Sequence, residues 1–200
     1  MGNIYYRRSL RLKHYDYSRA GFYFITICTQ GREHLFGEIV DDVMVLGVAG
    51  QLIHRLWYEM IDDFPNIALH EFVIMPNHIH GIIQIVDNKK QHVGADSISA
   101  QICMQKNIDC TIEQRAEMDS QRADMESAPT VSTMIQSFKR HTTLQYIKMV
   151  KNNTLPPFNK RIWQRNYYEH IIRDDVDYNR IATYIINNPL TWDDDVLSKP

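Results

Sequence analysis

Residues 22–28 read Phe-Tyr-Phe-Ile-Thr-Ile-Cys, an almost unbroken run of aromatic and β-branched side chains. Such a run predicts a strand that is buried on both of its faces. Two further apolar runs predict strands over 69–75 and 78–86, with a proline in the break between them. We also expect a strand over Tyr167–Ile172 and a short one near Val43–Leu46.

Helical periodicity separates these strands. Apolar residues recur at helical spacing from Val48 to Ile61, and the sequence Asp62-Asp63-Phe64-Pro65 ends that helix. A second helix begins after Pro129-Thr130, and a last helix covers 175–187 before Pro189. This order of elements predicts an α+β fold: a ferredoxin-like antiparallel sheet with helices packed on one face, followed by a C-terminal helix.

The composition fits one ordinary domain of 200 residues, of which 44% are hydrophobic and 23% charged. No stretch of eighteen apolar residues occurs, so we expect no membrane helix, and the N-terminus has no apolar segment typical of a secretory signal. The three cysteines lack Cys-x-x-Cys spacing. We therefore expect a cytoplasmic protein in a reducing compartment.

One segment, 87–128, does not fit the pattern of strands and helices. It is polar and rich in glutamine, and it contains a duplicated heptad at 114–120 and 121–127. Two heptads are too few for a coiled coil. We expect a flexible insertion within a single domain that spans residues 1–200.

The net charge of −2 conceals an uneven distribution. Residues 1–19 carry +4 and residues 130–173 carry +7, whereas the rest of the chain is acidic. A solvated surface explains most such runs, and a phosphate-binding surface is the functional alternative. Aromatic residues occur within the second basic block, as base stacking in single-strand binders requires. Among them are Phe158, Trp163, Tyr167 and Tyr168. Trp163 and Tyr167 are the candidates for stacking, although a tryptophan at such a position more often belongs to the core.

The sequence Met75-Pro76-Asn77-His78-Ile79-His80-Gly81 is the sharpest candidate for chemistry. Side chains alternate between the faces of a strand, so His78 and His80 point the same way while Ile79 and Gly81 take the other face. Two imidazoles anchored in this way can converge on one cation. The alternative is a pair of exposed histidines that are hydrogen-bonded to their neighbours.

The last helix supplies a second candidate. Tyr184 and Asn188 lie four residues apart at the edge of an apolar arc that includes Tyr178 and Ile181. Tyr184 is either a boundary tyrosine with its hydroxyl in water or a nucleophilic phenol beside a ligating amide. Because Asn188 precedes Pro189, we expect its backbone to leave the α region.

Several motifs together resemble one protein family. Tyr-Ile-Ile-Asn-Asn-Pro (184–189) resembles the signature of the REP-associated tyrosine transposases, which belong to the single-tyrosine HUH transposase superfamily of bacterial insertion sequences. Residues 75–80 resemble their His-hydrophobic-His motif. Residues 7–17 and 24–29 are similar to their N-terminus and first strand, and 163–173 to the segment before the tyrosine helix. The resemblance covers about 5–86 and 130–190.

The resemblance implies an enzyme that cleaves and rejoins single-stranded DNA through a 5′-phosphotyrosine on Tyr184. It also implies that His78, His80 and Asn188 hold a divalent metal, for which Mg²⁺ or Mn²⁺ suits the ligand types. Its partner would be single-stranded DNA with hairpin-forming repeat ends, bound by a monomer or a homodimer and without a membrane. The candidate DNA-binding residues are Arg7, Arg8, Arg11, Lys139, Arg140, Trp163, Arg165, Tyr167 and Arg173.

Two other classes of protein share part of this pattern. A relaxase or replication-initiator nickase has a histidine pair and a tyrosine, but the far C-terminal position of Tyr184 favours a transposase. A domesticated, non-catalytic protein that binds single-stranded nucleic acid would not need His78, His80 and Tyr184 intact.

Overall fold

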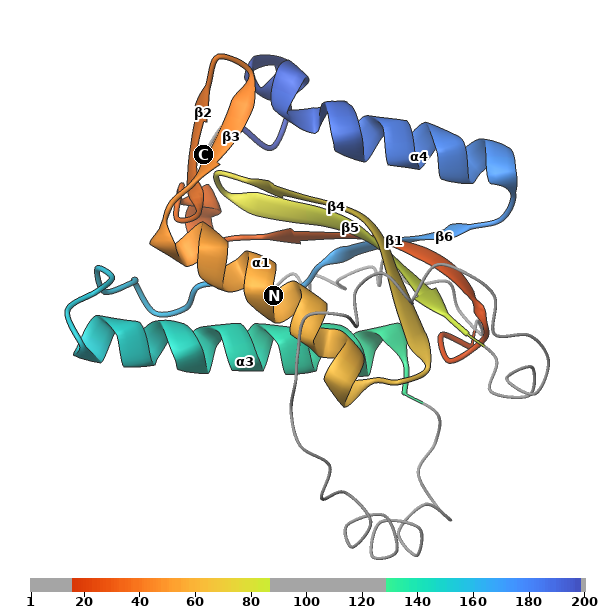
Figure 1. Ribbon diagram of the computed structural model, residues 1–200, viewed down its shortest axis with the longest axis horizontal. Coiled ribbons are helices and arrows are strands. Elements are labelled where there is room, and N and C mark those ends of the chain that lie inside the picture. The colour runs from red at the N-terminus through yellow and green to blue at the C-terminus, as the bar shows by residue number, and fades with distance from the viewer. Residues whose placement is uncertain (1–15, 87–128, 199–200) are drawn as a thin grey trace, which may run out of the picture.

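The computed structural model describes residues 16–86 and 129–198. Its centre is a four-stranded antiparallel sheet in the order β4-β5-β1-β6. Three helices flank this sheet (Figure 1). The strands are β1 (Gly21–Cys28), β4 (Ile67–Met75), β5 (His78–Ile85) and β6 (Tyr168–Ile172), and the helices are α1 (Val48–Asp63), α3 (Val131–Lys151) and α4 (Asp175–Asn187).

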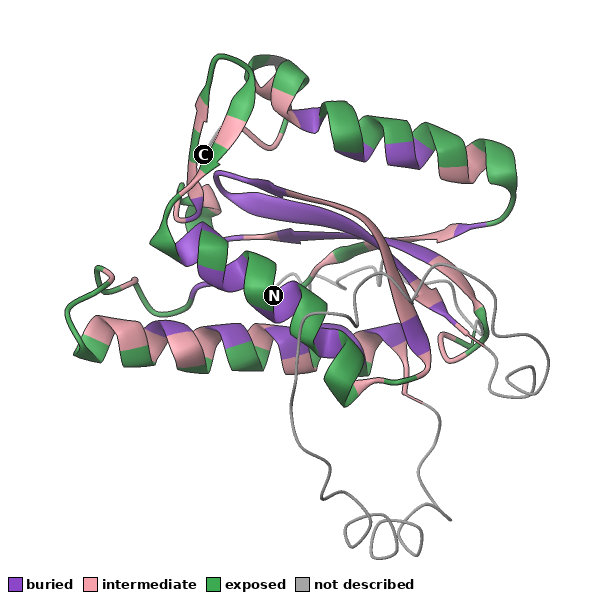
Figure 2. Ribbon diagram, in the orientation of Figure 1, coloured by how far each residue is buried: buried purple, intermediate pink, exposed green. Residues whose placement is uncertain are grey.

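The two central strands, β1 and β5, pair along their full length, from Gly21 opposite Ile85 to Cys28 opposite His78. Both strands are buried over most of their length, as Figure 2 shows. Helices cover the sheet on both faces, and this explains why the 22–28 run contains so few polar residues. The predicted strands and helices are all present in the described residues.

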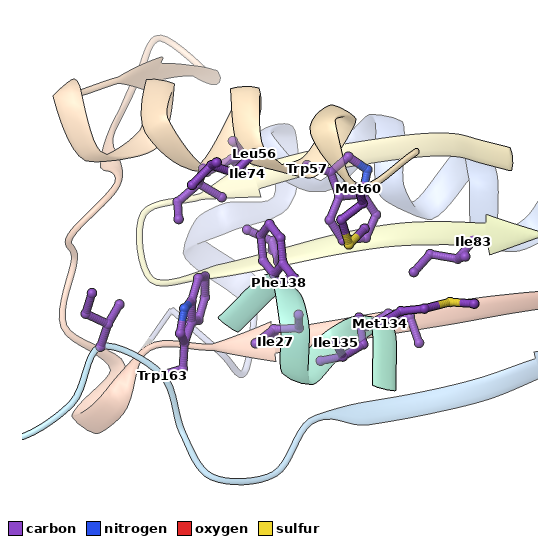
Figure 3. Close-up of a cluster of buried hydrophobic side chains, with 14 of the residues drawn as sticks. Ile27, Leu56, Trp57, Met60, Ile74, Ile83, Met134, Ile135, Phe138 and Trp163 are labelled. Carbon is purple, nitrogen blue, oxygen red and sulfur yellow. The ribbon is translucent and has the colours of Figure 1, made fainter. Parts of the chain in front are cut away.

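One face of the sheet carries the larger apolar core, formed with α1 and α3 (Figure 3). Trp57 of α1 is fully buried there and stacks on Phe72 at a centroid distance of 4.4 Å. A Cβ atom at Gly81 would lie 2.5 Å from the Trp57 ring. Glycine at position 81 therefore lets the indole pack directly on β5.

The helix α4 packs on the opposite face of the sheet. Its buried residues Ile181, Ala182 and Ile185 contact a smaller cluster that includes Phe24 and Ile82. The α+β fold with an antiparallel sheet is thus confirmed. The expectation that the helices pack on one face holds only for α1 and α3, because α4 covers the other face. The apolar arc of α4 fits the even-numbered side chains of β1 and β5, which would otherwise face water.

Capping residues fix where the last two helices begin. The Thr130 side chain accepts a hydrogen bond from the Thr133 amide, and Asp174 does the same for Asp177. At its other end α4 continues directly into the 3-10 helix η5 (Asn188–Asp194).

The expected departure of Asn188 from the α region is wrong. Its backbone has φ −57° and ψ −40°, and Pro189 follows at the start of η5, where a proline needs no amide hydrogen. Asn188 therefore stays on the side of α4 that carries Tyr184, one turn further along.

A separate two-stranded hairpin is formed by β2 (Gly37–Val40) and β3 (Val43–Leu46). The sequence predicted β3 but not its partner. The two loop residues, Asp41 and Asp42, both have positive φ, at 49° and 61°. This is the backbone of a type I′ turn, which usually contains asparagine or glycine, so an Asp-Asp pair is only a weak signal for a hairpin.

The expected insertion at 87–128 lies outside the described residues. Among those that are described, no helix is both long and apolar enough to cross a membrane.

Candidate active site

The side chains of His78 and His80 lie on the same face of β5, the face covered by α4. They are 0% and 2% exposed, and their Nε2 atoms are 3.0 Å apart. Ile79 and Gly81 point into the opposite core, as the alternation of strand side chains predicted. The pair is therefore buried, which excludes the alternative of two exposed strand histidines.

Asn77 determines which nitrogen of His78 carries the proton. Its side-chain amide nitrogen donates to the backbone oxygens of Leu197 and Arg32, at 2.8 and 3.3 Å. Its Oδ1 therefore faces His78 Nδ1, 2.7 Å away, and can only accept a hydrogen bond. A neutral His78 then has its proton on Nδ1 and a free lone pair on Nε2.

Thr26 of β1 performs a similar role for His80, with its Oγ1 2.8 Å from His80 Nδ1. When His80 Nδ1 donates to this hydroxyl, the Nε2 lone pair of His80 is also free. Hydrogen bonds from the second nitrogen are the usual means by which a protein orients metal-binding imidazoles.

Both imidazoles are held neutral by their surroundings. Burial lowers the pKa of His78 to about 3, and the nearby Arg32 guanidinium adds to the shift. Burial also lowers the pKa of His80 well below its usual value, with His78 adding to it. Neutral imidazole is the form that binds a metal ion.

Asp195 is a third potential ligand that the sequence analysis missed. Its Oδ2 lies 3.8 Å from His78 Nε2, and the ligand atoms of His78, His80 and Asp195 all lie within 4.8 Å of one another. This oxygen is buried and has no hydrogen-bond partner among the described residues. In the sequence, Asp195 is one of several acidic residues near the C-terminus, and no motif distinguishes it from the others.

Asn188, the third ligand implied by the family resemblance, also lies in the site region. It is 1% exposed, and neither atom of its side-chain amide finds a hydrogen-bond partner in the described part of the chain. Buried polar atoms usually have a partner, so the Asn188 amide oxygen, close to Tyr184, is a candidate metal donor. The chain thus offers two candidate oxygen donors beside the two nitrogens.

The spacing of the two nitrogens fits a metal ion. Ligand atoms about 2.1 Å from an ion and at right angles to one another lie about 3.0 Å apart, and the two Nε2 atoms are 3.0 Å apart. Two free lone pairs at this distance repel unless a proton or a cation lies between them. The group formed by His78, His80 and Asp195 can therefore bind a metal.

The segment after α4 brings Asp195 to the histidines. Arg32 donates to the backbone oxygen of Val196 at 2.7 Å, and the Leu197 amide donates to Asp195 Oδ1 at 2.8 Å. The Trp192 ring stacks beside His78 at a centroid distance of 6.0 Å. The contacts of Arg32 with Val196 and of His78 with Trp192 join positions more than a hundred residues apart, which sequence periodicity cannot reveal.

Tyr184 reaches the histidine pair from α4, with its hydroxyl 3.3 Å from His80 Nε2. The side chain is 42% exposed, so it has access to solvent. Burial and the negative charge of Asp195 raise the pKa of Tyr184, and the neighbouring Asn188 amide opposes the shift. The phenol is therefore protonated at neutral pH.

The predicted DNA-binding residues fall into distinct groups. Arg140, Arg165 and Arg173 are exposed, and Tyr167 is partly buried. Lys139 is partly buried, and its ammonium group donates to two backbone oxygens, those of Gln164 and Asn166. Arg7, Arg8 and Arg11 lie outside the described residues.

The expectation that Trp163 stacks on a base is wrong. Its side chain is 4% exposed and packs against Phe36 and Phe138 in the larger core. Its indole nitrogen donates to Thr142 Oγ1 at 2.8 Å, so both the ring and its polar group are used inside the protein.

A cavity of about 590 Å³ opens beside Tyr184 and His80. Strands β1 and β6, helix α4 and the 164–167 segment form its walls. Its position next to the tyrosine hydroxyl makes it the natural place for a substrate.

The fold and the site together define a class: an α+β domain in which a histidine pair on a central strand meets a tyrosine on the C-terminal helix. No protein-family model matches the chain. A Haemophilus influenzae protein, described only as uncharacterized, is 40% identical over 194 residues, which cover 97% of this chain and 94% of that one. The chain belongs to the same family as this protein.

Two solved structures are similar at lower identity. One is a REP-associated tyrosine transposase bound to a REP hairpin, with 18% identity and a TM-score of 0.49 over 90% of this chain and 73% of that one. The other, from Deinococcus radiodurans R1, is provisionally described as a transposase; it has 13% identity and a TM-score of 0.40 over 88% of this chain and 95% of that one.

Proposed function

We propose that this protein is a transposase of the REP-associated tyrosine type, which cleaves and rejoins single-stranded DNA through Tyr184. The observation that carries the proposal is the meeting of three groups from distant parts of the chain. The Tyr184 hydroxyl lies 3.3 Å from His80 Nε2, which in turn lies 3.0 Å from His78 Nε2. A nucleophile, a metal-binding pair and an adjoining cavity are the parts that strand transfer requires.

In the proposed reaction the Tyr184 oxygen attacks a DNA phosphodiester. A bond forms between this oxygen and phosphorus, and the bond from phosphorus to the 3′-oxygen breaks. The phenolic proton is balanced by the proton that the departing 3′-oxygen gains. The product is a 5′-phosphotyrosine and a free 3′-hydroxyl, and attack by a 3′-hydroxyl reverses the step without an external energy source.

His78 and His80 would hold a divalent ion, Mg²⁺ or Mn²⁺, with an oxygen from Asp195 or Asn188. When bound, the ion polarises the phosphate and stabilises charge on the 3′-oxygen. Asn77 and Thr26 orient the two imidazoles through their Nδ1 atoms. The contact of Tyr184 with His80 of the same chain supports a reaction within one protomer.

Single-stranded DNA with a hairpin is the proposed partner. The exposed guanidinium groups of Arg140, Arg165 and Arg173 support binding to its phosphates. Because phosphate contacts release counterions, binding should weaken steeply as salt concentration rises.

The proposal is tested by trapping a covalent adduct. The full chain is incubated with Mn²⁺ and a library of labelled single-stranded hairpins with random flanks, then denatured and separated by electrophoresis. We expect a labelled band at the mass of protein plus DNA, absent for Tyr184→Phe and retained by the control Tyr58→Phe, whose side chain is exposed on α1. An adduct formed by Tyr184→Phe would overturn the assignment of the nucleophile.

Adduct trapping also separates the alternatives. A non-catalytic binding protein retains DNA but yields no adduct that survives denaturation. A nickase yields the adduct but does not join the two flanks of an excised hairpin.

A further inference from the structure

We propose that the cavity beside Tyr184 binds one unpaired base of the DNA, next to the phosphate that is cleaved, and that Gln164 and Asn166 select this base. The inference rests on the proposed function for the identity of its ligand. It goes further by assigning a specificity site to residues outside the histidine pair and the tyrosine.

The lining of the cavity suits a nucleobase. Phe24 and Ile181 provide an apolar surface, and the aromatic residues Tyr167 and Tyr168 also line the cavity. The Lys139 ammonium group lies over the Tyr167 ring, 5.4 Å from its centroid. None of the described lining residues is acidic. A volume of about 590 Å³ lies within the usual range for small-molecule pockets. Aromatic and apolar walls of this kind bind unstacked bases in single-stranded nucleic acids.

The side-chain amides of Gln164 and Asn166 are available to a ligand. Both residues line the cavity, and neither amide makes a hydrogen bond to another described residue. Each amide offers both a donor and an acceptor, the combination needed to read the edge of a base. Asparagine and glutamine amides can make bidentate hydrogen bonds to a base edge, most often that of adenine.

The segment that carries these amides is held in place by backbone contacts. Lys139 Nζ donates to the backbone oxygens of Gln164 and Asn166 at 3.1 and 3.2 Å. The backbone N–H of Gln164 donates to the backbone oxygen of Cys28 at 2.9 Å. Burial lowers the pKa of Lys139 to about 8, so its side chain is still mainly protonated at neutral pH and can donate to both oxygens. A fixed backbone lets the side chains discriminate among bases, because little ordering accompanies binding.

A phosphate site adjoins the base site. Arg180 precedes Tyr184 by four residues on α4, so both side chains leave the same face of the helix one turn apart. The Asp177 carboxylate lies 2.6 Å from the Arg180 guanidinium and 2.7 Å from His170 Nε2. Arg180 and His170 both line the cavity. A nucleotide with its phosphate at Tyr184 and Arg180 would have its base in the same cavity, which Gln164 and Asn166 also line.

The test measures binding of the four deoxynucleoside 5′-monophosphates to the full chain, one at a time, by saturation-transfer NMR. We expect one nucleotide to bind more tightly than the weakest by roughly fivefold, the effect of one hydrogen bond. Gln164→Leu or Asn166→Leu should remove this preference. Gln136→Leu, an equivalent change on the exposed side of α3, should keep it.

Three results would overturn the base site: equal affinity for all four nucleotides, inorganic phosphate binding as tightly as any nucleotide, or a preference unchanged in both leucine variants. These readouts do not depend on cleavage. If no covalent adduct forms but the preference depends on Gln164, the proposed function fails and the base site stands. If the adduct forms without any preference, the function stands and the base site fails.

Discussion

The two faces of the central sheet have opposite chemistry although they share the same strands. On the face of α1 and α3, β5 contributes Ile79, Ile83 and Ile85 to an apolar core. On the face of α4, it contributes His78 and His80 to a buried polar site that also contains Asn188. Strand alternation thus places the stabilising and the chemical residues one position apart. Substitutions on the first face should lower stability, and those on the second should lower activity with less effect on stability.

The largest expected effect on the α4 face is that of His78→Ala. Removal of a metal-binding imidazole should lower the rate of adduct formation more than about 100-fold. This exceeds the loss that follows when only a residue hydrogen-bonded to a metal ligand is removed. Chelation of divalent ions should lower the wild-type rate to a similar level. Gel assays of adduct against time, with and without EDTA, measure both effects.

The matched control for His78→Ala is His54→Ala, on the exposed side of α1, which should keep the wild-type rate. Undiminished activity of the wild-type protein in EDTA would remove the metal from the proposal.

The largest expected effect on the other face is that of Trp57→Ala. Loss of this fully buried ring should lower the free energy of unfolding by about 3–5 kcal/mol, because a large cavity remains between α1 and the sheet. Urea unfolding monitored by circular dichroism measures it. Trp192→Ala, on the side of His78, should cost less because that ring is only partly buried. Equal losses for the two tryptophans would contradict the distinction between the faces.

Gly81→Ala tests how closely the two faces are coupled. The added methyl group would lie 2.5 Å from the Trp57 ring, and overpacking of this kind should cost about 1–3 kcal/mol. Because His80 is the preceding residue, a displaced β5 should also lower activity. Gly47→Ala is the comparison, since its nearest contact is an ordinary 3.6 Å. A Gly81→Ala protein as stable as the wild type would show that Trp57 can move aside.

The sequence predicted the parts of the fold that depend on local pattern. Alternation along β5 identified the shared face of His78 and His80, and helical spacing placed Tyr184 at the edge of an apolar arc. The pattern did not determine which face of the sheet α4 covers, because an apolar arc is compatible with either face. Trp163 was assigned to DNA binding because it lies in a basic stretch of sequence between Arg161 and Arg165, whereas its neighbours in space are Phe36 and Phe138.

The missed residue of the site, Asp195, illustrates the limit of sequence reasoning. Its place beside His78 depends on the next two residues, Val196 and Leu197, whose backbone oxygens accept hydrogen bonds from Arg32 and Asn77. These contacts span 164 and 120 residues. A charge count assigns Asp195 to an acidic tail, and only the folded chain shows one of its oxygens buried without a partner.

The smallest expected effect concerns the far end of the α4 face, where Tyr178 anchors the helix away from the site. Its hydroxyl donates to Glu71 at 2.7 Å, and burial together with Glu71 raises the pKa of Tyr178 to about 12. An unfolded tyrosine ionises near pH 10, so between about pH 10 and 12 the unfolded state loses a proton that the folded state keeps. The stabilising contribution of Tyr178 is therefore complete below pH 10 and is lost as pH rises towards 12. Urea unfolding at pH 9 and pH 11 measures how much free energy of unfolding each protein loses as pH rises. The loss should be smaller for Tyr178→Phe than for the wild type, whereas Tyr58→Phe should match the wild type. Equal losses in all three proteins would mean that Glu71 does not hold Tyr178 in its protonated form.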